Sequence, residues 1–234
     1  MSKIDTSGYF FHDHPATCDP DDFWGQVKRT VNGKTVDQRQ IDLIIEGIVE
    51  GTDLKEDDYI LDLCCGNGAL SRYIFPVCSG GIGVDFSDFL IDVANKNFAV
   101  EGRETYLLGD VLEYASDGTD KEAITKMFCF GSFQYLPVGK IEELLRNLYT
   151  HFPNLERCFI GNLPDKSKAA EFYKSRNQPQ EDLEDSTSAI GFWWDSSEFK
   201  KVAESAGWRM EFGRLPQEFY ASTYRFNATL LRDS

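Results

Sequence analysis

The stretch Tyr59-Ile-Leu-Asp-Leu-Cys-Cys-Gly-Asn-Gly-Ala-Leu70 decides the fold of this chain. Tyr59 to Leu63 is a short apolar run of strand length, and it leads into Cys64-Cys65-Gly66-Asn67-Gly68. Glycines let a backbone approach a ligand closely, and a helix that starts after such a turn presents free N–H groups. The same composition also suits an ordinary tight turn, since a short glycine motif is a weak signal.

Strand and helix patterns alternate on the carboxyl side of this stretch. Helices are predicted at 69–77, 86–98, 138–151, 168–174 and 195–207, and further strands at 81–84, 105–108, 126–130, 157–160, 208–212 and 219–231. Alternation of this kind predicts a parallel sheet with helices on both faces. The last two strands have no helix between them, so they should pair antiparallel. The expected fold class is α/β, with a seven-stranded, mostly parallel sheet and a reversed C-terminal strand.

The part that precedes the alternating pattern is expected to be helical. Asp21 and Asp22 predict a helix that runs through Val31. A second helix is predicted over 35–50, where four isoleucines at spacings of three and four share one face. We expect residues 1–56 to form an N-terminal lid or cap segment, and residues 57–234 to form the ligand-binding domain.

Composition excludes several classes of protein. The net charge of −15 and the pI of about 4.6 argue against a nucleic-acid partner, because a phosphate backbone would be repelled. No apolar run reaches the ~20 residues of a membrane span. The six cysteines show no CxxC spacing and no secretory signal is apparent, so we expect a cytoplasmic protein with reduced thiols and no metal site.

Polar or glycine-containing elements follow four consecutive predicted strands, where an α/β sheet binds its ligands. Asp85 lies 17 positions after Gly68 and can accept hydrogen bonds from both ribose hydroxyls of an adenosine ligand. Asp110 follows Gly109 and can accept from an adenine amino group. Gly131-Ser-Phe-Gln-Tyr135 would face the reacting end of the ligand. Each aspartate can also be a helix cap, but turn chemistry does not easily explain all four elements in strand order.

These elements together resemble the motifs of class I S-adenosylmethionine-dependent methyltransferases of the small-molecule type. The matching stretches are Tyr59 to Leu70, Gly83-Val-Asp-Phe-Ser87, Leu108-Gly-Asp-Val111, Gly131-Ser-Phe-Gln-Tyr-Leu136 and Ala206-Gly-Trp208. The resemblance covers about 57–231. It implies a Rossmann-like, doubly wound sheet with an N-terminal helical lid. It also implies S-adenosylmethionine as cofactor and S-adenosylhomocysteine as product.

The resemblance also assigns the cofactor contacts. It implies that the amino-acid end meets Asp62, Cys64, Gly66 and Gly68, the ribose Asp85, the adenine Asp110 and Val111, and the sulfonium Gly131 and Ser132. Further cofactor-binding residues are expected at Asn67, Phe86, Ser87 and Gly109. One residue departs from the family pattern. Cys64 stands where the family has its first glycine, so the backbone of the loop is expected to differ locally.

Methyl transfer is an in-line displacement, so the enzyme mainly aligns its reactants, which can contribute ~7–11 kcal/mol. A hydroxyl acceptor also needs a general base, whereas a carboxylate or phosph(on)ate is already ionised. Tyr135 and His14 are the candidate catalytic residues. Trp24, Arg29, Gln134 and Tyr135 are the candidate contacts to a small-molecule acceptor. Arg29 belongs to residues 24–39, where four basic residues against one acidic residue give a local charge of +3.

We predict O-methylation of a hydroxyl, carboxylate or phosph(on)ate. Asn162-Leu163-Pro164-Asp165 faintly resembles the motif of amino-group methyltransferases, but it lacks the second proline and is interpreted as a loop. N- or C-methylation of a small metabolite and an inactive cofactor-binding module stay open as alternatives. A nicotinamide-dependent oxidoreductase is disfavoured, because Ser71 occupies the last position of G-x-G-x-x-G/A.

Overall fold

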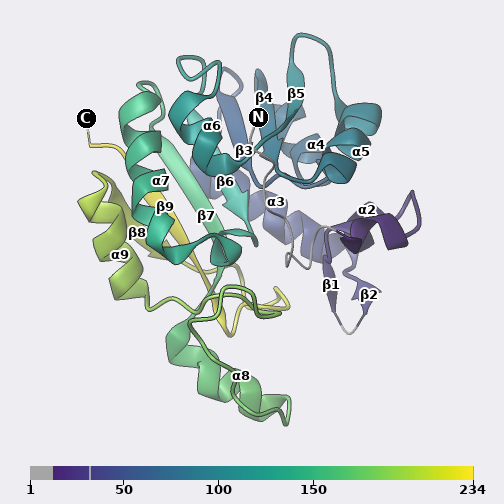
Figure 1. The fold of residues 1–234 in the computed structure, drawn as a ribbon, viewed down its shortest axis with the longest axis vertical. Helices are drawn as coiled ribbons and strands as arrows, with labels where there is room; N and C mark the ends of the chain where they lie inside the picture. Colours follow the sequence, from purple (N-terminus) through teal and green to yellow (C-terminus); the bar gives the residue numbers. More distant parts are fainter. Residues whose placement is uncertain (1–12, 32, 234) are drawn as a thin grey trace.

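The computed structural model describes residues 13–31 and 33–233. Its centre is a seven-stranded sheet with the order β5-β4-β3-β6-β7-β9-β8 (Figure 1). The strands are β3 (Tyr59–Leu63), β4 (Gly80–Asp85), β5 (Glu104–Leu108), β6 (Lys126–Phe130), β7 (Arg157–Pro164), β8 (Arg209–Gly213) and β9 (Arg225–Leu231). β9 runs antiparallel to both β7 and β8, and the other pairs are parallel. The predicted sheet with a reversed C-terminal strand is therefore confirmed.

Helices cover both faces of the sheet (Figure 1). The longer ones are α3 (Gln38–Thr52), α5 (Asp88–Phe98), α6 (Val111–Asp117), α7 (Val138–His151), α8 (Ala169–Ser175) and α9 (Ser196–Ser205). The short ones are α2 (Phe23–Gln26), α4 (Ser71–Ile74) and the 3₁₀ turns η1 (Pro15–Thr17), η2 (Phe75–Val77), η3 (Phe133–Tyr135) and η4 (Lys166–Lys168). No helix among the described residues is long and apolar enough to cross a membrane.

Strand β3 shows why the sheet needs helices on both sides. Leu61 and Leu63 pack into one core with α6, α7 and α9, whereas Ile60 packs into a second core with α3, α4 and α5. Successive residues of a strand point to opposite faces. A strand with apolar residues on both faces, such as β3, is stable only when both faces are covered. α3 lies within the predicted N-terminal segment and packs against β6 and β7. The division at residue 56 stays a prediction.

The predicted helix from Asp21 to Val31 is wrong in its length. Asp22 does cap α2, since its side chain accepts a hydrogen bond from the Gly25 N–H at 2.9 Å. The helix ends at Gln26, because Lys28 adopts a φ of +51°, which stops helical hydrogen bonding. A two-stranded hairpin of β1 (Thr30–Val31) and β2 (Lys34–Thr35) follows in place of the helix.

Two other elements differ from the prediction. Helix α6 had not been predicted, and it begins where Asp110 accepts hydrogen bonds from the N–H groups of Leu112 and Glu113 at 2.7 and 3.2 Å. β7 continues through Asn162 to Pro164, so the interpretation of this segment as a loop is wrong. The strand extends because β9 pairs with it on both sides of an irregularity between Ile160 and Leu163.

The turn after β3 takes the backbone shape that its glycines allow. Gly66 and Gly68 have φ values of +57° and +75°, in the left-handed region. Cys64 joins them with a φ of +60°, although it carries a side chain. That the loop backbone differs locally from the family pattern stays a prediction. Cys64 holds the left-handed conformation that a glycine adopts without strain.

We predict that Cys64→Gly changes the free energy of unfolding by less than ~1 kcal/mol. Glycine relieves the left-handed strain, which stabilises the folded state. It also raises the conformational entropy of the unfolded chain, which offsets that gain. Cys64→Val should lower the free energy of unfolding by about 1–3 kcal/mol, because a β-branched residue is a genuine outlier at positive φ. Urea unfolding measures both, and Cys158→Val on strand β7 is the matched control, expected to be nearly neutral. Equal stability of the two valine variants would contradict the left-handed assignment.

Candidate active site

A cavity of about 700 Å³ opens at the carboxyl ends of the parallel strands. It collects most of the residues that the sequence had singled out, namely Trp24, Arg29, Asp62, Cys64, Gly66, Asn67, Asp85, Phe86, Asp110, Val111, Gly131, Ser132, Gln134 and Tyr135. Gly68, Ser87, Gly109 and His14 are not among its lining residues. The first three shape the turns beside the cavity, and Ser87 caps α5 by accepting from the Leu90 N–H at 3.4 Å.

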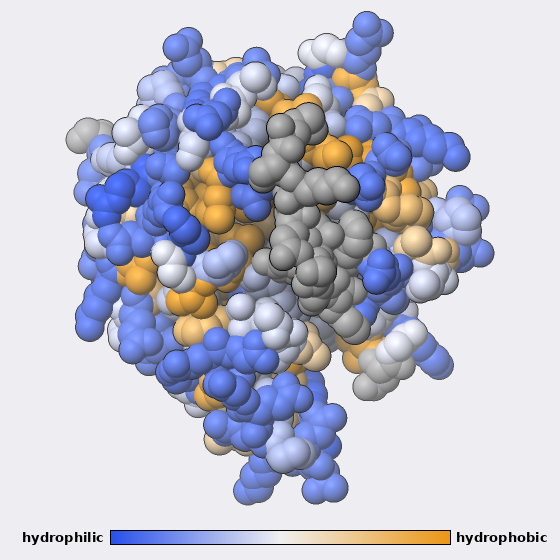
Figure 2. Space-filling view, in the orientation of Figure 1, coloured by the Kyte–Doolittle hydropathy of each residue, from blue (hydrophilic) through white to orange (hydrophobic). Residues whose placement is uncertain are grey.

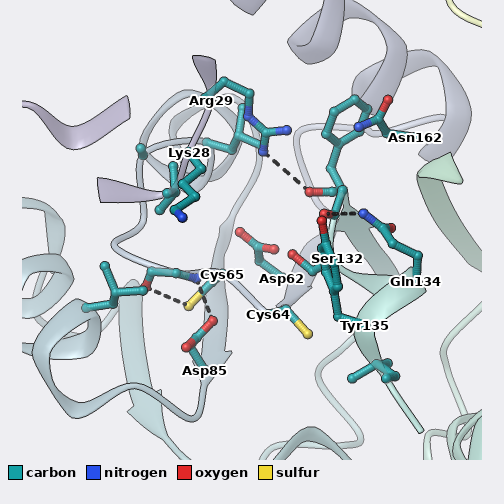
Figure 3. Close-up of a pocket in the computed structure, with 18 of the residues that line it drawn as sticks. Lys28, Arg29, Asp62, Cys64, Cys65, Asp85, Ser132, Gln134, Tyr135 and Asn162 are labelled. Atoms are coloured by element: carbon teal, nitrogen blue, oxygen red, sulfur yellow. Dashed lines mark hydrogen bonds between the residues drawn. The ribbon is translucent and has the colours of Figure 1, made fainter. Parts of the chain in front are cut away.

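Asp85 ties two strand ends together beside this cavity. One carboxylate oxygen accepts a hydrogen bond from the Gly66 N–H at 2.9 Å (Figure 3). The other accepts from the Ser87 N–H at 3.0 Å. Burial raises the pKa of Asp85, and these N–H donors act in the opposite direction. From the end of β4, the carboxylate thus fixes the glycine turn that follows β3, and it still lines the cavity.

Asp62 supplies a second buried carboxylate, from the end of β3. Ser71 donates a hydrogen bond to it at 2.5 Å. Burial raises the pKa of Asp62 well above its usual value, and the nearby charge of Asp85 raises it further. Two buried carboxylates in one cavity repel each other, so a cationic ligand group beside them would be stabilised.

The far end of the cavity is formed by α6. Oδ1 of Asp110 accepts hydrogen bonds from the two N–H groups that start this helix. Asp110 is therefore a helix cap, which was one of the two roles that the sequence allowed. No described residue bonds its second carboxylate oxygen. Asp110 can therefore cap α6 and accept from a ligand amino group at the same time.

The turn after β6 forms the middle of the cavity floor. Gly131 has a φ of +79°, and the Gln134 side-chain amide donates to its carbonyl oxygen at 2.8 Å. The Tyr135 hydroxyl donates to the Ala189 carbonyl oxygen at 2.9 Å. Burial raises the pKa of Tyr135, and the charges of Arg225 and Arg29 lower it less. Tyr135 therefore stays a protonated donor near neutral pH.

The N-terminal segment forms one wall of the cavity. The Asn67 side-chain nitrogen donates to the Phe23 carbonyl oxygen at 2.8 Å and to Gln26 Oε1 at 2.9 Å, which holds α2 against the glycine turn. Arg29 reaches across to β6, where a guanidinium nitrogen lies 3.4 Å from the Phe130 carbonyl oxygen (Figure 3). Its positive charge lowers the pKa of Asp62. Arg29 thus lies between the aspartates and the floor.

Several lining residues were missed by sequence reasoning. They are Gln26, Lys28, Cys65, Asn162, Tyr220, Tyr224 and Arg225. Asn162 and Arg225 come from β7 and β9, whose pairing brings together residues more than sixty positions apart. A local sequence pattern carries no signal for such a contact. The faint motif resemblance of Asn162-Leu163-Pro164-Asp165 was the one sequence signal near this wall. It was not followed, because the stretch was interpreted as a loop.

The remaining candidates lie elsewhere. The His14 ring nitrogen Nε2 lies 3.0 Å from the Gly25 carbonyl oxygen, so this histidine ties η1 to α2. Of the other basic residues in 24–39, Arg39 pairs with Glu46 at 3.1 Å and Lys34 is exposed on the hairpin. Within residues 13–31 and 33–233, no three histidine, cysteine or acidic side chains are grouped to hold a metal ion.

Comparison with known sequences gives two matches. Residues 60–153 match a family model described as a methyltransferase domain. A curated relative, an uncharacterized methyltransferase of Schizosaccharomyces pombe, is 44% identical over 110 residues, which is 44% of this chain and 38% of the relative. The chain therefore matches about two fifths of that relative's length.

Solved structures share the fold at low sequence identity. A magnesium protoporphyrin IX methyltransferase from Synechocystis PCC 6803 with bound S-adenosylhomocysteine aligns with a TM-score of 0.60 at 15% identity, covering 84% of this chain and 83% of that one. An S-adenosylmethionine-dependent methyltransferase from Clostridium acetobutylicum gives 0.61 at 16%, with coverages of 85% and 93%. A small RNA methyltransferase gives 0.61 at 16%, with coverages of 84% and 25%. Residues 60–153 of this chain therefore match the methyltransferase-domain family, and the chain shares its fold with solved S-adenosylmethionine-dependent methyltransferases.

Proposed function

We propose that this protein is an active S-adenosylmethionine-dependent methyltransferase that transfers its methyl group to an oxygen of a small molecule. The proposal is carried by one observation: the predicted cofactor residues and the predicted acceptor residues line the same cavity of about 700 Å³. Reactions of this kind need both reactants aligned in one enclosed site.

The cofactor would lie along the strand ends in chain order. Asp62 would accept from its amino group, Asp85 from the ribose hydroxyls and Asp110 from the adenine. Its amino group and sulfonium are both cationic, and they would offset the repulsion between Asp62 and Asp85. When bound, the cofactor supplies an electrophilic methyl group on a sulfonium that is a good leaving group. The chain itself needs to orient the acceptor and keep water away.

The acceptor would occupy the other half of the cavity, beside Gln134, Tyr135 and Arg29. Ser132 lies with these side chains in Figure 3, next to Cys64 and Asp62. Since Tyr135 stays protonated, we assign it the role of a hydrogen-bond donor that positions the acceptor, with its hydroxyl exchanging the bond to the Ala189 carbonyl oxygen for one to the acceptor. His14 has no place in this proposal, because it lies outside the cavity lining.

A small acceptor fits the charge of the molecule better than a nucleic acid. The net charge of −15 opposes a phosphate backbone, and the face in Figure 2 is dominated by hydrophilic residues with apolar residues in patches between them. The solved structures with this fold act on acceptors as different as a porphyrin and small RNA.

Cofactor binding tests the proposal most directly. Calorimetric titration with S-adenosylmethionine and S-adenosylhomocysteine should give micromolar dissociation constants. We predict that Asp85→Asn weakens both by about 10–100-fold, because hydrogen bonds to a charged acceptor contribute roughly 1.5–3 kcal/mol. Asp58→Asn is the matched control, since Asp58 is also buried but lies at the opposite end of β3. Its affinity should be unchanged.

The outcomes separate clearly. Absence of binding of either ligand to the parent protein would refute the cofactor assignment. Equal losses in Asp85→Asn and Asp58→Asn would show a general effect on folding in place of a ribose contact. Thermal unfolding of both variants reports how much stability each substitution removes.

Tyr135→Phe tests how the acceptor is positioned. We predict a fall in kcat of about 2–10-fold, the value of one net hydrogen bond, with an unchanged pH profile between about pH 7 and 9. The raised pKa of Tyr135 keeps it protonated over this range. S-adenosylhomocysteine formation with an acceptor from a panel of hydroxylated and acidic metabolites is the measurement. Tyr59→Phe, at the far end of β3, is the control. A loss of ~10²–10⁴-fold that removes a pH-dependent limb would instead make Tyr135 a general base.

A further inference from the structure

We propose that the acceptor carries an oxyanion, a carboxylate or a phosph(on)ate, and that the guanidinium of Arg225 binds it inside the cavity. This inference rests on the proposed function and names its substrate class. It is carried by a buried cation that has no anionic partner among the described residues, at a cavity wall built by an irregular strand pair.

Arg225 is the first residue of β9 and only 8% exposed. Its Nη1 donates to the Asn162 carbonyl oxygen at 3.0 Å, while its buried Nε has no hydrogen-bond partner. Within residues 13–31 and 33–233, no carboxylate lies within 4.0 Å of it. The neighbouring Arg214 differs, because it pairs with Asp165. Burying a cation without a counter-charge is strongly unfavourable, so an anionic ligand at Arg225 would remove a large penalty.

The backbone at Asn162 creates this wall. The β7–β9 register shifts between Ile160 and Leu163, and Asn162 adopts a φ of +67° within the shift. The Asn162 N–H donates a hydrogen bond to Asn227 Oδ1 at 2.9 Å, and this bond holds the strained residue in place. Left-handed backbone at a non-glycine residue is uncommon, and such residues cluster at functional sites. The conformation places the Asn162 side chain against the turn after β6. A Cβ atom added to Gly131 would lie 3.4 Å from the Asn162 side-chain nitrogen.

Other unpartnered polar atoms mark the same place. Asn162 Oδ1 and Gln134 Oε1 are buried and accept no hydrogen bond, and their residues are 7% and 2% exposed. Buried polar atoms in native proteins are nearly always paired, by protein, water or ligand. Figure 3 shows both side chains on the same side of the cavity, with Gln134 beside Ser132 and Tyr135 and Asn162 above Gln134 in the view. A polar ligand group at this wall would complete these bonds.

The surrounding residues define the rest of the acceptor. Ile190, Tyr220 and Tyr224 line the cavity together with Arg225, and the Arg225 guanidinium lies 5.2 Å from the centre of the Tyr224 ring. These side chains offer contact to an apolar body. Guanidinium groups bind carboxylate and phosphate oxygens in a planar geometry, so the oxyanion is the group that orients the ligand. The acceptor is therefore an organic acid with a compact apolar part.

The experiment uses full-length protein saturated with S-adenosylhomocysteine. Benzoate, phenylphosphonate and the neutral isostere benzamide are titrated by ligand-observed NMR. We expect at least one oxyanion to bind tenfold or more tightly than benzamide. Preference for benzoate identifies a carboxylate acceptor, and preference for phenylphosphonate identifies a phosph(on)ate acceptor. No preference for either oxyanion over benzamide would overturn the proposal.

Arg225→Met supplies the second readout. It should lose at least tenfold in oxyanion affinity, while the melting temperature without ligand stays equal or rises, because an unpaired buried charge is removed. Arg209→Met, on the exposed edge strand β8, is the control and should keep the parent affinity. A marked fall in melting temperature with unchanged oxyanion affinity would make Arg225 a structural residue and overturn the proposal. If Arg225→Met does not fold, Arg225→Gln takes its place in the same titrations.

Calorimetry with S-adenosylhomocysteine on the same samples separates the two levels of inference. Failure of the parent protein to bind S-adenosylhomocysteine refutes the proposed function. Binding of S-adenosylhomocysteine without oxyanion preference refutes only the role of Arg225.

Discussion

The hydrogen bond from the Gly66 N–H to the Asp85 carboxylate, at 2.9 Å, is the contact on which the site depends. It joins the turn after β3 to the end of β4, two adjacent strand ends. The turn can meet Asp85 only because Cys64, Gly66 and Gly68 all hold left-handed backbone conformations. One carboxylate thus sets the loop shape and also presents itself to the cavity.

This arrangement has an electrostatic consequence. Asp62 and Asp85 are both buried, and burial raises the pKa of each carboxyl group. Arg29 on one side and Arg225 on the other bring positive charge to the same cavity. The cavity is therefore divided electrically, with acids at the ends of β3 and β4 and arginines beside β6 and at the start of β9. The first part suits a cationic ligand, and the second part suits an anionic one.

The walls of the cavity come from distant parts of the chain. Asn67 holds α2 over the glycine turn through bonds to Phe23 and Gln26, and Arg29 then reaches β6. On the opposite side, the irregular pairing of β7 with β9 places Asn162 beside Gly131. Trp194 is buried in the main core and Trp193 in a cluster with Phe172 and Tyr173, against which the cavity residue Tyr224 packs.

The sequence by itself determined the alternating strands and helices, the order of the strand-end motifs and most of the strand-end residues that line the cavity. These features depend on local periodicity and turn chemistry, which are written in neighbouring residues. Tertiary structure decided the early end of α2, the course of β7 through Asn162 and the presence of Arg225 in the cavity. Each depends on contacts between residues distant in the chain, such as Asn67 with Phe23 and Arg225 with Asn162, and local patterns carry no information about them.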